Sequence, residues 1–391
     1  MGKSRTAPNP DIKPEQLLGG VSPETFLRDY WQKRPLLVRQ ALPHFSPPSK
    51  NPLGPDGLMR LAMREDAESR LVCQTRGRWT LEYGPFGAER LGALPRRNWS
   101  LLVSGVNLML PYGDRLLQAF GFMPQARLDD LMVSYAPEGG GVGPHFDSYD
   151  VFLIQGHGRR RWEISGQNDL ELVEGAPLRI LKRFRPEQSW ELEPGDLLYL
   201  PPKYAHNGVA LDPCMTWSVG FRAPSSHEIA SAFLDYRQDR LDLAGMYSDP
   251  DLTLPRHSAE LTPQLLGRLS EMIQGARWTA RDEADFLGTY LSEPKPHIFF
   301  EPPARPMGLK RFADRVASRG LRMDPRSKLL FIKGGAFFIN GEAFRSPAGC
   351  RQALVRLADQ RRLPAAPLPD ALLRLFHDWY RAGYMWPAGE N

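Results

Sequence analysis

Short β-type runs, separated by Gly and Pro, fill the part of the chain from residue 70 to 222. They read LVCQTRGRWTLEYGPF, DLMVSYAP, DVFLIQ, RRRWEIS, SWELEPGDLLYLPP and TWSVGFRA. Many short strands at close spacing are typical of an antiparallel sandwich or barrel. The pattern therefore predicts an all-β unit, and it predicts that DVFLIQGHGRRRWEI is one of its hairpins, with the turn at Gly156 to Gly158.

Before this unit the sequence predicts a short helix and an extended segment. In SPETFLRDYWQKRPLLVRQAL, Ser22 suits the N-cap, Pro23 the first helical position and Glu24 the first turn, so a helix is expected to reach about Lys33. The PLLVRQA stretch after it is expected to be extended. Residues 1–223 are thus predicted to form a β-structured domain with an N-terminal helical extension.

Residues 224–295 change to a helical periodicity. The stretch TPQLLGRLSEMI has Leu265, Leu266, Leu269 and Ile273 on one face of the expected helix. A helix with such a face buries it against another helix or against a second copy of the chain. We therefore predict a helical dimerisation region and a homodimer.

The final part, residues 296–391, is expected to combine helices with a hairpin. LKRFADRVASRG and PDALLRLFHDWYRAG are expected to be helices, and KLLFIKGGAFFING is expected to form a two-stranded wing between them. This order predicts a small winged-helix-like α+β domain. From residue 301 onward, 16 Lys and Arg stand against 8 Asp and Glu. That surplus indicates proximity to RNA or to the ribosome, or else an arginine-rich solvated face.

Composition limits the class of protein and its compartment. Hydrophobic residues make up 42% and charged residues 24%, as in average soluble globular proteins, and no apolar run approaches the roughly 18 residues of a membrane helix. Cys73, Cys214 and Cys350 form no CxxC pair, and the N-terminus lacks the apolar core of a signal peptide. We expect a cytoplasmic protein with no membrane partner.

The stretch GGGVGPHFDSYD places two good metal ligands, His145 and Asp147, behind a glycine-rich loop. Side chains two residues apart on a strand point to the same side, so both can reach one ion. A later stretch, EPGDLLYLPPKYAHNGVA, delivers His206 after an apolar strand. Two histidines and one carboxylate form the facial triad of non-haem Fe(II) oxygenases, which leaves positions on the iron open. His157 falls in the predicted turn and is expected to face solvent.

A facial triad commonly works with 2-oxoglutarate, whose distal carboxylate needs a cation. In GHGRRRWEI the arginines alternate between the two faces of a strand, so either Arg160 alone or the pair Arg159 and Arg161 points inward. Trp162 is not expected to share the face of Arg160. An arginine buried in a barrel wall is costly without an anion, whereas a carboxylate matches its fork geometry.

The stretch GGGVGPHFDSYDVFLIQGHGRRRWEI, followed by EPGDLLYLPPKYAHNGVA, closely resembles the Jumonji-C (JmjC) ribosomal oxygenases, and specifically the bacterial ribosomal-protein arginine hydroxylases. The resemblance implies an α+β chain with a double-stranded β-helix of the cupin or jelly-roll type, a helical dimerisation region and a winged-helix-like domain. It also implies 3-hydroxylation of one arginine in the large-subunit ribosomal protein numbered sixteen, with Fe(II), 2-oxoglutarate and O2 as cofactor and co-substrates.

The resemblance also carries over to single positions. His145, Asp147 and His206 match the iron ligands of the family, which makes them the expected catalytic and metal-binding residues. Arg160 matches the residue that binds the distal carboxylate of 2-oxoglutarate.

Further residues near the motif are expected to hold the co-substrate and the substrate. Ser134, in LMVSYAP, matches a serine that helps to hold 2-oxoglutarate, but Ala136 stands where the resemblance implies a second serine. Asp150, Tyr135 and Tyr149 are candidates for the acidic and aromatic walls that a cationic arginine favours. Strand alternation prevents all three from lining one pocket.

Two other functions stay open at this point. The chain could be a 2-oxoglutarate oxygenase that acts on histidine, asparagine or methylated lysine in a protein, or on RNA. It could also be a non-catalytic scaffold that binds the ribosome, although an intact triad together with Arg160 argues against a scaffold.

Overall fold

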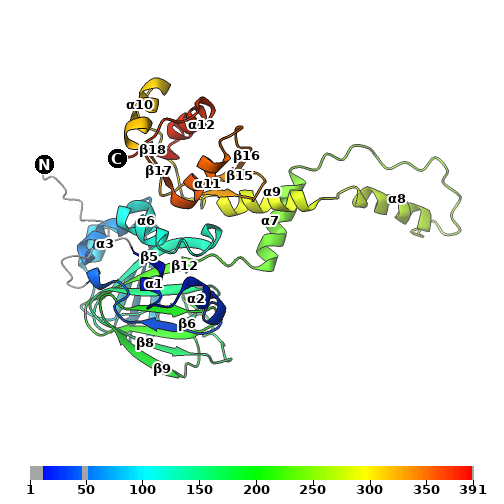
Figure 1. The fold of residues 1–391 in the computed structure, drawn as a ribbon. Helices are drawn as coiled ribbons and strands as arrows, with labels where there is room; N and C mark the ends of the chain where they lie inside the picture. The colour runs from blue at the N-terminus through cyan, green and yellow to red at the C-terminus, as the bar shows by residue number, and fades with distance from the viewer. Residues whose placement is uncertain (1–11, 46–51, 390–391) are drawn as a thin grey trace. The chain divides into compact units, whose positions relative to one another are not determined.

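The computed structural model describes residues 12–45 and 52–389 (Figure 1). The chain forms two compact units. The first comprises the described part of residues 1–223 together with 295–327 and 359–389, and the second comprises 224–294 and 328–358. None of the helices within the described ranges is long and apolar enough to cross a membrane.

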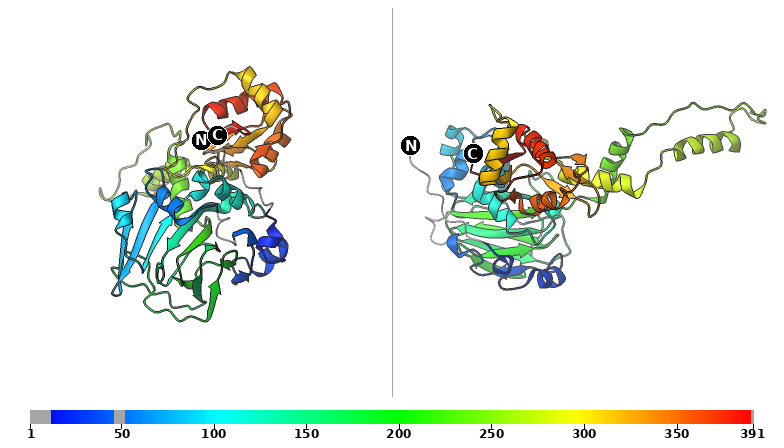
Figure 2. Two further views of the ribbon diagram at one scale, coloured as in Figure 1. Left: turned by 90° about the vertical axis from the view of Figure 1, so that its left-hand side faces the viewer. Right: turned by 45° about the horizontal axis from the view of Figure 1, so that its top comes forward.

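Two antiparallel sheets dominate the first unit (Figure 2). The larger sheet has the order β1 (Leu36–Val38), β10 (Leu197–Leu200), β7 (Val151–His157), β12 (Cys214–Phe221), β5 (Leu128–Ala136), β4 (Trp99–Val103), β2 (Ser69–Thr75) and β3 (Arg78–Tyr83). The smaller sheet has the order β6 (His145–Phe146), β11 (Ala205–Ala210), β8 (Arg160–Ser165) and β9 (Gln188–Leu192). The sheets pack face to face, because apolar side chains of β7 and β10 form one buried cluster with those of β8 and β9.

The strands that follow β5 change from one sheet to the other along the chain, as in a double-stranded β-helix. β6 lies in the smaller sheet, β7 in the larger and β8 in the smaller again. The predicted hairpin of β7 and β8 is therefore wrong, because β7 pairs with β10 and β12 whereas β8 pairs with β9 and β11. The chain crosses between the sheets at Gly158, where φ is 57° and a Cβ would lie 2.2 Å from the Pro213 carbonyl oxygen. Glycine is required there.

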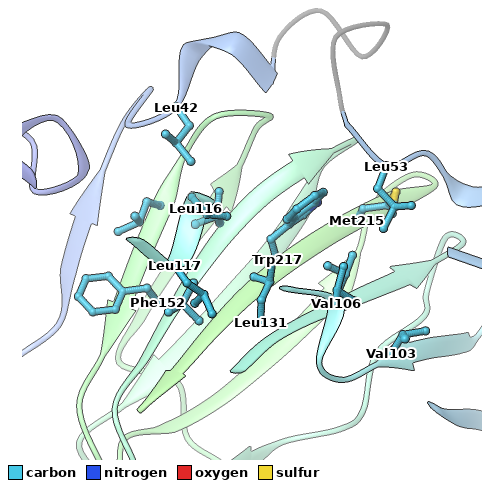
Figure 3. Packing of buried hydrophobic residues seen from close by; sticks show 14 of the residues in the cluster. Leu42, Leu53, Val103, Val106, Leu116, Leu117, Leu131, Phe152, Met215 and Trp217 are labelled. Carbon is cyan, nitrogen blue, oxygen red and sulfur yellow. The ribbon is translucent and has the colours of Figure 1, made fainter. Parts of the chain in front are cut away.

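Helices cover one face of the larger sheet and form the main core with it (Figure 3). They are α1 (Pro14–Leu17), α2 (Pro23–Asp29), η1 (Pro43–Phe45), α3 (Pro55–Ala62), α4 (Ala88–Gly92), α5 (Val106–Met109) and α6 (Pro111–Gln118), and the short η3 (Gln125–Arg127) before β5 buries no side chain. On β5, Leu131 and Val133 are buried in this core, and alternation turns Met132 and Ser134 toward the smaller sheet. Each large apolar side chain buried here contributes about 1.5 to 3 kcal/mol.

The helix predicted to begin after Ser22 starts where expected but is shorter. The Ser22 hydroxyl oxygen accepts a hydrogen bond from the N–H of Thr25 at 3.2 Å, as an N-cap does. The helix ends at Asp29 because the chain turns away at Gln32, where φ is 56°. The Gln32 N–H bonds to the Tyr199 hydroxyl at 2.8 Å and is lost to the helix. The extended segment predicted after this turn is β1.

The rest of the first unit comes from the C-terminal part of the chain. It contains α10 (Leu309–Arg319), α12 (Asp370–Arg381) and a sheet of β17 (Arg362–Leu363), β13 (Leu321–Met323) and β18 (Met385–Pro387). Phe312 of α10 and Tyr380 of α12 stack with ring centroids 5.1 Å apart. Both helices were predicted.

The second unit combines helices with a small sheet. It contains α7 (Ser226–Gln238), α8 (Pro263–Gln274), α9 (Ala280–Ser292), most of α11 (Arg351–Gln360) and a sheet of β14 (Leu329–Phe331), β15 (Phe337–Ile339) and β16 (Glu342–Phe344). The predicted wing is β14 and β15, and β16 adds a third strand that was not predicted. Helix α9 was also missed, although Thr279 and Asp282 form a capping box at its start.

Candidate metal and co-substrate site

The glycine-rich stretch before His145 is a loop that passes very close to other backbone. A Cβ on Gly140 would lie 2.1 Å from the carbonyl oxygen of Trp99. Gly143 has a φ of 79°, and a Cβ there would lie 2.6 Å from Ile180. Glycines are therefore needed for this path, which delivers His145 to the start of β6.

His145, Asp147 and His206 come together between the sheets. One ligand atom from each lies within 4.8 Å of the others, and no second such group of His, Cys, Asp or Glu occurs among the described residues. Strand pairing brings the ligands together, because His145 on β6 lies directly opposite His206 on β11. The Nε2 atom of His206 lies 3.7 Å from Oδ2 of Asp147. His157 ends β7 instead of lying in a turn, and it is not part of the cluster.

Backbone carbonyls hold one ring nitrogen of each histidine. Nδ1 of His145 lies 2.9 Å from the Gly143 oxygen, and Nδ1 of His206 lies 2.9 Å from the Tyr204 oxygen. A ring N–H that donates to a carbonyl leaves Nε2 without a proton, which is the form that binds a metal. Burial, reinforced by the His145 ring, lowers the pKa of His206 to about 4, so this ligand is neutral at physiological pH.

Arg160 is the arginine that points inward. It is 5% exposed, whereas Arg159 lies on the surface and pairs with Asp212 at 2.9 Å. Nε and Nη2 of Arg160 are buried and have no hydrogen-bond partner among the described residues. The guanidinium carbon lies 5.7 Å from the Trp162 ring centre. The expectation that these two side chains lie on different faces is wrong, because residues two apart on a strand share a face. A buried guanidinium with free donors fits a carboxylate.

Ser134 lies on the larger sheet, where the strand register gives it polar neighbours. It is buried and lies opposite Thr216 of β12, whose hydroxyl donates to Gln155 at 3.2 Å. Ala136 lies opposite Cys214, and both are fully buried. The absent second serine is therefore replaced by an apolar contact.

Two of the three expected substrate walls have other roles. Asp150 is fully buried, and its carboxylate accepts hydrogen bonds from Tyr199 at 2.7 Å and from Gln32 at 2.9 Å. Tyr135 packs against Trp99 with ring centroids 5.6 Å apart, on the face of β5 that contacts the main core. Neither side chain is available to a substrate, which leaves Tyr149.

Asp130 is a functional candidate that the sequence interpretation missed. Its Oδ2 accepts a hydrogen bond from Gly105 N–H at 2.9 Å, whereas Oδ1 has no hydrogen-bond partner among the described residues. A Cβ on Gly220 would lie 3.8 Å from this Oδ1 and 4.0 Å from Cε2 of Tyr149. The Asp130 carboxylate and the edge of the Tyr149 ring therefore both lie next to Gly220, which has no side chain to fill the space. Desolvation and the charges of Asp147 and Asp130 raise the pKa of Tyr149, which follows the candidate ligand Asp147 by two residues in sequence.

Strand alternation was the signal that could have revealed Asp130. Met132 and Ser134 lie two and four residues after it on β5, so all three share the inward face. Asp129 turns the other way and pairs with Lys295 at 3.0 Å. The two neighbouring aspartates thus have different surroundings.

The site combines two histidines and a carboxylate on a double-stranded β-helix, and a buried unpaired arginine lies on the same inner surface. This combination is typical of the 2-oxoglutarate-dependent non-haem iron oxygenases. Comparison with known proteins agrees with this class. The model of the JmjC domain matches residues 115–229, and the model of the ROXA-like winged helix matches residues 275–385.

Relatives and solved structures cover nearly the whole chain. The chain is 37% identical over 350 residues to the ribosomal protein uL16 3-hydroxylase of Escherichia coli, which covers 89% of this chain and 91% of that protein. It is 36% identical over 260 residues to a probable ribosomal oxygenase of Haemophilus influenzae, which covers 64% and 61% of the two chains. Two structures of E. coli YcfD, the second in complex with cobalt and 2-oxoglutarate, match with TM-scores of 0.83 and 0.80 at 35% identity. They cover 94% of this chain and 98% and 99% of theirs.

The chain therefore belongs to the JmjC ribosomal oxygenases. The predicted α+β class, with a double-stranded β-helix and a winged helix, is confirmed. The predicted enzyme class, a 2-oxoglutarate-dependent oxygenase, is confirmed as well.

Proposed function

We propose that this chain is an Fe(II)- and 2-oxoglutarate-dependent hydroxylase that places a hydroxyl group on C3 of an arginine in ribosomal protein uL16. The observation that carries the proposal is the meeting of His145, Asp147 and His206 on the same inner surface as the buried, unpaired Arg160. The E. coli relative, a uL16 3-hydroxylase, supports the choice of substrate.

Each of these residues has a simple task in that reaction. His145, Asp147 and His206 would hold the iron, and the free donors of Arg160 would hold the distal carboxylate of 2-oxoglutarate. When bound, the iron and its co-substrates O2 and 2-oxoglutarate would supply the oxidation: one oxygen atom enters a C–H bond, the other enters succinate, and 2-oxoglutarate loses one carboxyl group as carbon dioxide. Ser134 would add a hydrogen bond to the co-substrate. The remaining work of the protein is to position the substrate carbon.

Asp130 and Tyr149 are the groups we assign to the arginine substrate. A guanidinium placed above Gly220 would meet the free Oδ1 of Asp130 and the edge of the Tyr149 ring. The positive charge and planar donors of arginine match a carboxylate and an aromatic side chain. Burial raises the pKa of Asp130, and the charge of Lys295 opposes the rise, so a substrate guanidinium would add a second cation beside this carboxylate.

The test is intact-mass spectrometry of a uL16 peptide that contains the target arginine, incubated with the enzyme, Fe(II), ascorbate and 2-oxoglutarate. We expect the mass of one oxygen atom to be gained with the wild-type enzyme and with His157→Ala, and to be absent with His145→Ala. Succinate without peptide oxidation would mean an oxygenase with another substrate, such as a different protein residue or RNA. Neither product would mean a scaffold without catalysis.

The apolar face of α8 supports a homodimer. In the described residues α8 has no buried side chain, and Leu266 is 50% and Ile273 75% exposed. Figure 1 shows α8 apart from the other helices of its unit, at the end of a long segment. We propose that a second copy covers this face, and that residues 224–295 act as the dimerisation region between a catalytic part, 1–223, and a winged-helix part, 296–391.

We also propose that the enzyme works in the cytoplasm, close to ribosomal RNA. Three cysteines without a disulfide, Cys73, Cys214 and Cys350, suit a reducing compartment. The excess of Lys and Arg after residue 300 suits a position beside the ribosome.

A further inference from the structure

The second unit has a hollow that the proposed hydroxylation does not use. It has a volume of about 580 Å³ and lies between the start of α9, the turn that joins β14 to β15, and the segment that leads from β16 into α11. Three arginines from three different elements line it, Arg281, Arg345 and Arg351, and the only acidic side chain in the lining is Asp285. The lining thus carries a net charge of +2.

This charge stands out against the unit that carries it. Residues 224–294 and 328–358 hold 11 Lys and Arg and 13 Asp and Glu, so the unit as a whole has a net charge of −2. Three arginines with a single acid nevertheless converge on this one hollow. Their convergence indicates an anionic partner.

One arginine is held in place before any partner arrives. Arg351 donates to the carbonyl oxygens of Gly335 at 2.7 Å and Ile332 at 2.6 Å, and its guanidinium lies 4.9 Å from the centre of the Phe337 ring. These contacts fix the β14–β15 turn and the charge beside it. A preorganised cation loses little conformational entropy when it binds an anion.

The other two arginines form no strong ion pair among the described residues, so their guanidinium groups are available to an anionic ligand. Arg345 is exposed and has no hydrogen bond or ion pair among the described residues. Arg281 is 74% exposed and lies 3.7 Å from Asp285, a distance typical of a weak surface pair. At the turn itself, a Cβ on Gly334 would meet no atom within 4 Å, so a ligand backbone can approach the chain closely there.

We propose that this hollow binds the phosphate backbone of RNA. A polyanion presents several phosphates in a row, which suits guanidinium groups spread over three elements of an open surface. Apolar lining at Ile332, Ala336 and Pro347 can contact sugars and bases beside the phosphates. The choice of RNA as the polyanion rests on the proposed action on a ribosomal protein. The evidence for a basic hollow is independent of that proposed function.

The experiment measures the binding of a short fluorescein-labelled single-stranded RNA to the full-length protein by anisotropy over a series of salt concentrations. The test variant is Arg281→Gln/Arg345→Gln, and the matched control is Arg256→Gln, an exposed arginine of the same unit outside the hollow. We expect the double variant to bind about tenfold more weakly at about 0.1 M salt, and the slope of log K against log salt to fall by about 1.4, since each phosphate contact contributes about 0.7. The control should bind like wild type.

Other results would overturn the proposal. If wild type does not bind RNA, or if the double variant binds RNA as tightly as wild type, this hollow is not an RNA site. Polyglutamate and inorganic phosphate are tested in the same way. If the double variant loses binding of polyglutamate but binds RNA like wild type, the hollow is a site for an acidic protein. If it loses binding of phosphate instead, the hollow is a site for a small anion. Hydroxylation of the free uL16 peptide is measured on the same samples and should be unchanged, so a failure of the proposed enzymatic function is seen separately.

Discussion

The Tyr199 hydroxyl donates a 2.7 Å hydrogen bond to Oδ1 of Asp150, three residues beyond the candidate metal ligand Asp147 in sequence. The same hydroxyl accepts the N–H of Gln32, and the Gln32 side chain donates to Oδ2 of Asp150 at 2.9 Å. Burial raises the pKa of Asp150, and these donors oppose the rise. The N-terminal extension is thus bound to the segment that carries the candidate metal ligand Asp147.

Tyr199→Phe removes the hydroxyl at the centre of this network. It leaves one oxygen of Asp150 and the N–H of Gln32 without their partner, so we expect the free energy of unfolding to fall by about 2 kcal/mol. Urea denaturation of the metal-free protein measures the change. Tyr83→Phe is the control, because Tyr83 is 69% exposed and its hydroxyl should not matter for stability. An unchanged midpoint in Tyr199→Phe would show that the network is not stabilising.

Arg160→Gln tests the co-substrate site. Loss of the charge that we propose binds the distal carboxylate should raise the KM for 2-oxoglutarate at least tenfold, since a bond between two charged groups contributes about 1.5 to 3 kcal/mol. Metal affinity, measured by calorimetry with Co(II), should stay close to that of wild type. Arg161→Gln is the control on the neighbouring strand position, whose side chain lies 3.8 Å from Glu163. A normal KM in Arg160→Gln would remove Arg160 from the co-substrate site.

The sequence was a good guide wherever chemistry and local spacing decide the structure. The spacing of His145 and Asp147 predicted two ligands on one side, and the apolar strand before His206 predicted the third. The pairing of β7 and β8 could not be predicted in this way, because local turn signals do not tell which of two sheets a strand joins. That choice depends on contacts between residues far apart in sequence.

The role of Asp150 shows the same limit for a single side chain. Its position next to the motif indicated a substrate wall, but burial and the partners Tyr199 and Gln32 make it structural. Those partners lie 49 and 118 residues away. Asp130 was overlooked because Tyr149 is far from it in sequence and comes close to it only in the folded chain, where both lie beside Gly220.

The low pKa of His206 predicts how the metal-free protein responds to acid. Burial holds the pKa near 4 in the folded state, against an ordinary value of 6.5, so the unfolded chain binds the proton more readily. Stability is therefore fully present above pH 6.5 and falls as the pH drops from 6.5 toward 4, by roughly 3 kcal/mol at most from this group. Denaturation curves at several pH values should show a flatter dependence in His206→Gln. Equal slopes in the two proteins would contradict a buried neutral His206.

A charge on the apolar face of α8 tests the proposed homodimer. Leu269→Asp places a carboxylate among Leu266, Met272 and Ile273, where a partner would have to bury it. We expect wild type to be a dimer by light scattering after gel filtration, and Leu269→Asp to be a monomer. Gln274→Glu, on the opposite side of α8, is the control and should remain dimeric. A wild-type monomer, or a dimeric Leu269→Asp, would exclude this face as the interface.

Asp130→Asn tests the assignment of the arginine site through a change in preference rather than a simple loss. Wild type should hydroxylate the arginine peptide at least tenfold more efficiently than a peptide with citrulline at that position, because only the guanidinium forms a charged pair with Oδ1. Asp130→Asn should lose most of that preference, with kcat/KM for arginine reduced and that for citrulline little changed. Asp129→Asn is the control, since Asp129 is engaged by Lys295. Equal discrimination in Asp130→Asn and wild type would show that another group recognises the substrate charge.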